Sequence, residues 1–137
     1  MSIEIRQQNI VNGIYILSVN VSYILMENIE MVRGFTITDG TYEAHVNITF
    51  DGNGKTILIK NNLEFTGLFP KPITVTNLGI LSSQAKLFDY AGWFFANGSN
   101  TNYIRGGSAT NCYSTGAIDN AGGGIFGGWS SECFATN

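Results

Sequence analysis

The sequence predicts an all-β chain whose short strands stack as the rungs of a parallel β-solenoid. Three observations lead to this fold class. The first half alternates apolar and polar side chains, the composition is rich in glycine and asparagine but poor in charge, and the chain contains internal repeats. In a solenoid each coil packs only on its neighbours, so several similar coils are needed to bury one core.

The clearest predicted strand covers residues 41–50, where every second side chain is apolar. β-Branched residues dominate the first half, which favours strands over helices. No segment has a convincing amphipathic helical pattern, and the best candidate, residues 82–89, is weak. Shorter strands are expected at residues 19–25, 35–37 and 56–59, with turns at Asp39-Gly40 and Asp51-Gly52-Asn53-Gly54.

The composition excludes several classes of protein. Only 12% of the 137 residues are charged, the net charge is −3, and Lys and Arg do not cluster, so we do not expect nucleic-acid binding. No apolar run is long enough to span a membrane. Two cysteines do not make a disulfide framework, and we expect Cys112 and Cys133 to be buried free thiols.

Three short segments repeat along the second half of the chain. Each has a small or flat position followed by two apolar residues, and their starts lie 26 and 31 residues apart. The segments are Gly67-Leu68-Phe69, Trp93-Phe94-Phe95 and Gly124-Ile125-Phe126.

A second repeat begins with asparagine. Residues 77–80 and 111–118 each start with Asn and an apolar residue and then reach Gly and Ile. Ala109-Thr110-Asn111 also recurs at residues 135–137. Glycine and asparagine tolerate the left-handed backbone that solenoid corners need, and stacked asparagines can form amide ladders.

These residues resemble a known group of proteins. Gly123-Gly124-Ile125-Phe126-Gly127 is similar to the GLUG-type repeat, and Asn111-Cys112-Tyr113-Ser114-Thr115-Gly116 is similar to the segment that accompanies it. Residues 50–57 resemble the opening rung of right-handed parallel β-helix proteins. Such arrays occur in large DNA viruses (giant viruses) and in bacterial surface proteins, and Ala91-Gly92-Trp93-Phe94-Phe95 looks more like the viral versions. The resemblance implies a right-handed solenoid scaffold without an active site.

The resemblance covers residues 48–137, which we expect to form the solenoid. Residues 1–47 are expected to form an irregular β-rich cap or the first rungs. Asn137 corresponds to Asn111 of the earlier copy, which continues with Cys112, so we expect the last repeat to be incomplete. An open strand edge of this kind invites pairing with another chain or with further rungs.

Few residues suggest chemistry. His45 is the only histidine and lies on the polar side of its predicted strand. Asp51 and Asn53 resemble the start of a calcium loop, but Lys55 stands where a ligand is needed, so we expect a turn. No spacing selects a pair of carboxylates for glycoside hydrolysis. We therefore predict no catalytic residue, no metal site and no cofactor.

Aromatic side chains are the better candidates for binding. Trp93, Tyr103, Tyr113 and Trp129 could present surfaces on which sugars or a partner protein stack, whereas Phe94, Phe95 and Phe126 are expected in the core.

The predicted function is a non-enzymatic structural module. Its expected place is the virion, as a minor capsid, cement or fibre-associated protein that binds other structural proteins through strand edges or end-stacking. The alternatives are a cell-surface adhesin segment that binds carbohydrate or a host receptor, and a β-helix carbohydrate-active enzyme.

Overall fold

The computed structural model describes residues 1–38, 45–60, 64–82, 85–88, 90–96, 104–118, 123–127, 130–131 and 133–136. Within these residues the regular elements are short strands and one 3-10 helix, η1 (Gln7–Asn9). The strands are β1 (Ser2–Ile5), β2 (Ile16–Leu17), β3 (Val21–Leu25), β4 (Ile29–Met31), β5 (Thr36–Ile37), β6 (Ile48–Asp51), β7 (Thr56–Ile59), β8 (Thr74–Thr76), β9 (Gly79–Ser82), β10 (Ile104–Arg105), β11 (Ser108–Thr110), β12 (Tyr113–Ser114), β13 (Ser130–Ser131) and β14 (Phe134–Thr136).

The strands form two larger sheets and two small ones. A six-stranded sheet has the order β1-β3-β6-β8-β11-β14, and a four-stranded sheet has the order β4-β7-β9-β12. The pairs β2-β5 and β10-β13 form the small sheets, and every pairing between these strands is parallel. The prediction of an all-β chain with parallel sheets is therefore confirmed.

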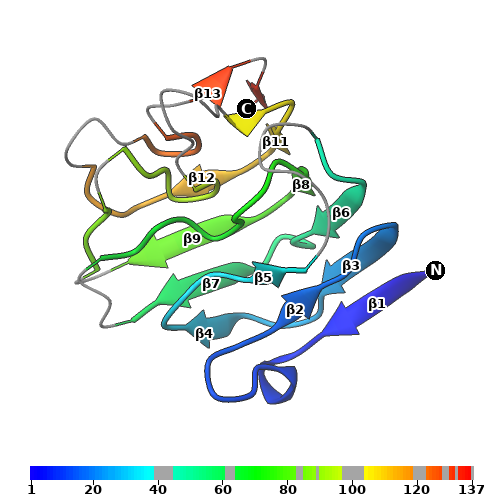
Figure 1. Ribbon diagram of the computed structural model, residues 1–137. Coiled ribbons are helices and arrows are strands. Elements are labelled where there is room, and N and C mark those ends of the chain that lie inside the picture. Colours follow the sequence, from blue (N-terminus) through cyan, green and yellow to red (C-terminus); the bar gives the residue numbers. More distant parts are fainter. Residues whose placement is uncertain are drawn as a thin grey trace.

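The chain visits the two larger sheets in turn. The strand pairs β3 and β4, β6 and β7, β8 and β9, and β11 and β12 each place one strand in the six-stranded sheet and the next in the four-stranded sheet. Successive pairs lie side by side, so the chain advances from β1 at one end of the stack to β12 near the other (Figure 1). Residues 1–38 join the same sheets as the residues that follow them.

Alternation of side chains along the strands sets which side of the six-stranded sheet is buried. Tyr23, Phe50, Val75 and Ala109 lie opposite one another in register and are buried. The residues that precede them face outward and carry hydroxyl groups, and Thr49 Oγ1 donates to Ser22 Oγ at 2.7 Å. The sheet therefore has one apolar face and one largely polar face, on which Glu4 and Asp51 also lie, as expected for a half-buried sheet.

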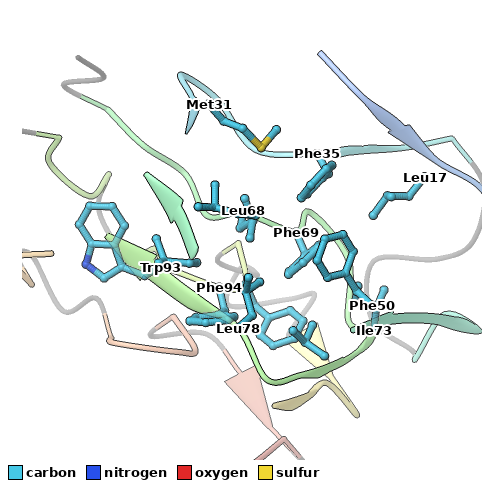
Figure 2. Close-up of a cluster of buried hydrophobic side chains, with 14 of the residues drawn as sticks. Leu17, Met31, Phe35, Phe50, Leu68, Phe69, Ile73, Leu78, Trp93 and Phe94 are labelled. Carbon is cyan, nitrogen blue, oxygen red and sulfur yellow. The ribbon is translucent and has the colours of Figure 1, made fainter. Parts of the chain in front are cut away.

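A column of aromatic rings runs through the core alongside these sheets. Phe35 stacks on Phe69 with ring centroids 5.5 Å apart, Phe69 contacts Phe95 at 5.9 Å, and Phe95 stacks on Phe126 at 4.9 Å. Phe50 approaches the same column from the six-stranded sheet, 5.3 Å from Phe69 (Figure 2). We call Phe35, Phe69, Phe95 and Phe126 the aromatic column.

Asparagines occupy the corners where the chain leaves or enters the six-stranded sheet. Asn20, Asn77 and Asn111 have φ angles of 66°, 54° and 54°, in the left-handed region that asparagine tolerates better than most residues. Asn77 and Asn111 follow β8 and β11 directly, and Asn111 Nδ2 donates to Asn77 Oδ1 at 3.2 Å. Asn47 Nδ2 likewise donates to Asn20 Oδ1 at 2.9 Å, before β6 and β3. The amide ladder expected from the sequence thus forms at two separate corners.

Some local predictions need revision. The helix η1 has no apolar pattern and was not expected, and residues 82 and 85–88 are not helical. The strand expected over residues 41–50 lies partly outside the described residues, and its regular part, β6, begins at Ile48. Ile48 is where parallel pairing with Val21 begins, so pairing rather than alternation sets the start of the strand.

Replacing Phe69 by Ala should destabilise the protein by about 3–5 kcal/mol, because removing a buried ring leaves a cavity. Phe69 is fully buried and contacts rings on three sides. Chemical denaturation would measure the change in the free energy of unfolding. Phe88→Ala is the matched control, since Phe88 is 45% exposed and its loss should change stability by less than about 1 kcal/mol. Similar losses for the two variants would contradict the role of the aromatic column.

Candidate functional site

The repeated aromatic segments lie side by side in the structure. Phe69 pairs with Phe95 in a parallel bridge, and Leu68 and Phe69 donate backbone hydrogen bonds to the carbonyls of Trp93 and Phe94. Gly92 pairs with Gly123, Trp93 N–H donates to the Gly123 carbonyl, and the N–H groups of Phe94 and Phe95 both donate to the Ile125 carbonyl. The segments that the sequence repeat identifies are thus neighbours, and Phe95 stacks on Phe126. Leu68, Phe69, Phe94 and Phe95 are fully buried, whereas Ile125 and Phe126 are partly buried.

The glycines of this repeat lie where two backbones come close together. A Cβ on Gly92 would collide with the backbone of Ile125 and Phe126. Gly67 has a φ of 110° and lies against the backbone of Phe95 and Ala96. A side chain at either position would push neighbouring segments apart, which explains glycine there.

The two copies of the asparagine repeat lie side by side at their first residues but not further along. Asn111 stacks on Asn77, but Gly79 lies opposite Tyr113 and Ile80 opposite Ser114. Gly79 and Gly116, the glycines of the two copies, are therefore not paired. Gly116 instead lies against the Trp93 indole, where a Cβ would collide with the ring.

Trp93 was predicted as a surface-binding aromatic, and this prediction was wrong. Its side chain is fully buried, its ring stacks on Phe65 at 5.3 Å, and its indole Nε1 donates to the Ala117 carbonyl at 3.0 Å. Burying the large ring while satisfying its single donor makes Trp93 a core residue. The predicted Tyr103 and Trp129 lie outside the described residues.

Tyr113 is the predicted aromatic that the structure does place on the surface. It is 52% exposed, and its ring lies across Gly79, where a Cβ would collide with the ring. The ring borders a pocket of about 150 Å³ at the asparagine corner, which also contacts Lys55, Asn77 and Asn111. We call this the Tyr113 pocket. The sequence indicated Tyr113 as a binding residue, but only the strand register shows that Lys55, Asn77 and Asn111 lie around the same pocket.

The backbone holds the pocket walls in place. Asn53 N–H donates to Asp51 Oδ1 at 2.8 Å, and Asn53 and Gly54 both have positive φ angles, so residues 51–54 form the expected turn. Lys55 N–H donates to the Gly52 carbonyl, and the Lys55 carbonyl accepts from Gly79 N–H. Lys55 is thereby fixed beside the segment on which the Tyr113 ring lies.

His45 contributes to a surface hydrogen bond rather than to a catalytic cluster. Its Nε2 lies 2.9 Å from Thr74 Oγ1, and its side chain is exposed. Within the described residues no three His, Cys, Asp or Glu side chains come close enough to hold a metal ion.

Cys112 and Cys133 are free thiols, and each is partly buried. Burial raises the pKa of the Cys112 thiol, an effect that hydrogen bonds with the backbone of Leu78 and Thr110 partly oppose. Cys112 also borders a pocket of about 180 Å³ together with Ala109, Ile125, Ala135 and Thr136, near the last strands of the stack.

A side chain covers one edge of the four-stranded sheet. Beside β4, the outermost strand of the four-stranded sheet, Gln7 Oε1 accepts from Glu30 N–H at 2.7 Å and Gln7 Nε2 donates to the Glu30 carbonyl at 3.1 Å. The side-chain amide thus makes the two bonds that a neighbouring strand would make. At the opposite end, β12 and β14 are the outermost strands of their sheets among the described residues. An edge of this kind can pair with another strand.

No protein-family model, curated protein or solved structure matches the chain. In the described part of the chain, no helix has the length and apolar character needed to cross a membrane.

Replacing Gln7 by Ala should free the backbone edge of β4. We expect the Glu30 amide to exchange with solvent faster, and the free energy of unfolding to fall by about 1 kcal/mol, because exposed hydrogen bonds contribute little net stability. Hydrogen–deuterium exchange followed by NMR would measure the first effect. Gln8→Ala is the control, since the neighbouring Gln8 is exposed. Unchanged exchange at Glu30 in the Gln7 variant would show that the amide does not protect this edge.

The raised pKa of Cys112 predicts slow alkylation. The Cys112 thiol keeps its proton to higher pH in the folded protein than in the unfolded protein. The stability that this thiol contributes is therefore fully present below the unfolded pKa of about 8.5 and is lost as the pH rises from there toward the folded pKa. In a Cys133→Ser background, iodoacetamide should modify Cys112 more slowly in the folded than in the urea-unfolded protein at about pH 8.5. Equal rates would mean that the thiol is not protected.

Proposed function

We propose that the chain is a right-handed parallel β-solenoid that serves as a non-enzymatic structural module of a virion. The proposed fold is supported by the order of the strands in the two larger sheets. Each sheet takes its strands in sequence order, and the chain alternates between the sheets. Crossovers between parallel strands of one sheet are almost always right-handed, which supports the proposed hand.

The core supports the same arrangement. The buried side chains of both larger sheets belong to one hydrophobic cluster, together with the aromatic column. In this fold the six-stranded sheet, the four-stranded sheet and the segments that carry the aromatic column are three walls around that cluster. One circuit of the three walls is one rung.

The strand edges of β12 and β14 are the observation that carries the structural role. One outer strand, β4, is covered by the Gln7 amide, while β12 and β14 present strand edges and the adjoining pocket contacts Ala109, Ile125 and Ala135. A rigid module with strand edges of this kind is suited to stack on other structural proteins through the end formed by β12 and β14. We propose such proteins as its partners.

The virion is proposed as its location from the resemblance of residues 91–95 and 111–116 to the repeats of large DNA viruses. A role as minor capsid, cement or fibre-associated protein would suit a surface made largely of Ser, Thr and Asn with only 12% charged residues. The fold resemblance alone does not select among these three roles.

Peptide mapping of the native source material tests the proposal. Peptides from residues 1–137 should enrich with purified particles, at a constant ratio to the major coat protein, and should resist a high-salt wash because strand pairing depends little on ionic strength. A chain recovered only from cell surfaces, or released from particles by salt, would contradict the virion role.

A further inference from the structure

The Tyr113 pocket combines an aromatic surface, amide groups and a positive charge at one corner of the molecule. Tyr113 comes from β12, Asn77 and Asn111 follow β8 and β11, and Lys55 precedes β7. Three segments far apart in the sequence thus meet around about 150 Å³ of open space. Small-molecule sites are typically concave, with an apolar wall and a few convergent polar groups.

The Tyr113 ring provides the apolar wall. It lies on Gly79, which has no side chain to lift the ring, and it remains 52% exposed. The face of an aromatic ring carries partial negative charge, which attracts the slightly positive C–H groups on the apolar face of a pyranose. Exposed Phe88 is 45% accessible but does not border this pocket, so exposure alone does not distinguish Tyr113.

The asparagine ladder provides hydrogen-bonding groups beside the ring. Asn111 Nδ2 uses one hydrogen to reach Asn77 Oδ1, and Asn77 Nδ2 makes a long contact of 3.5 Å with Asp51 Oδ1. An amide carries two donor hydrogens and an acceptor oxygen, so the second hydrogen of Asn111 Nδ2 can donate to a sugar hydroxyl beside the ring.

Lys55 gives the pocket its charge. Within the described residues, no carboxylate lies close enough to form an ion pair with its ammonium group. The adjoining turn fixes the Lys55 backbone, while its four-carbon side chain can adjust to a bound group. A carboxylate on the ligand would supply the counter-charge.

We propose that the Tyr113 pocket binds one pyranose residue of a glycan that carries a carboxylate. The apolar face of the sugar stacks on Tyr113, its hydroxyls bond to the Asn111 amide, and its carboxylate pairs with Lys55. Sialic acids and uronic acids both have this chemistry. The inference does not depend on a virion location, because a structural module in any setting can carry a glycan subsite.

NMR titration of the full chain tests the proposal with three probes: sialyllactose, trigalacturonate and neutral lactose. At least one of the two acidic probes should bind with a Kd of about 1 mM, as expected for a small, open site. Amide shifts should centre on Gly79, Asn111 and Tyr113, and lactose should bind at least about fivefold more weakly, which corresponds to about 1 kcal/mol for a partly exposed ion pair. The acidic probe that binds identifies the source of the carboxylate.

Four variants separate the parts of the site. Tyr113→Ala should weaken binding about tenfold, and Tyr113→Phe should retain it within about twofold because the ring is kept. Lys55→Gln should lower the affinity for the acidic probe to that for lactose, and Phe88→Ala should leave binding unchanged. Thermal unfolding of each variant checks that the fold is intact.

The proposal is overturned if neither acidic probe binds, if lactose binds as tightly as the acidic probes, or if Tyr113→Ala binds as well as the unmodified chain. Particle enrichment of the Lys55→Gln variant is a separate measurement, because Lys55 precedes β7 and lies outside the β12 and β14 edges proposed to bind other structural proteins. It should be normal if the structural role holds, so failure of one proposal would be distinguished from failure of the other.

Discussion

In-register stacking of the aromatic column is the interaction on which the other features of the structure depend. Phe35, Phe69, Phe95 and Phe126 can contact one another only if their segments align without a shift. A slip of one residue would turn the rings of a strand to the opposite face. Once the rings are aligned, the glycines beside them fall at close backbone contacts, and the polar corners of successive segments come together.

The same alignment places the asparagine turns of successive segments together, and these turns border the Tyr113 pocket on the surface. Left-handed backbone at Asn77 and Asn111 lets the chain turn from the six-stranded to the four-stranded sheet. Because the two turns are stacked, their amides lie within hydrogen-bonding distance and border the space beside Tyr113. The residues that make the turn possible thus also line the Tyr113 pocket.

The all-β class and the aromatic repeat could be predicted from the sequence because they depend on alternation and on local similarity. The failures involve residues whose environment depends on distant segments. Trp93 resembled a surface aromatic in a glycine-rich segment, yet Gly116 and Ala117 cover its ring and satisfy its indole nitrogen. The glycines of the asparagine repeat, Gly79 and Gly116, do not pair, because the parallel register places Tyr113 opposite Gly79. The covering of β4 by Gln7 left no sequence pattern, since a single glutamine carries no periodicity.

The strict sequence order of strands in the two larger sheets also has a consequence for how such a molecule can vary in size. Each strand pairs only with the strands of the preceding and following visits to its sheet. Duplicating or deleting one such unit would change the length of the stack by a single interstrand spacing, about 4.8 Å, and would leave the distant contacts unchanged. Evolution can therefore change the length of the strand stack in small, uniform increments.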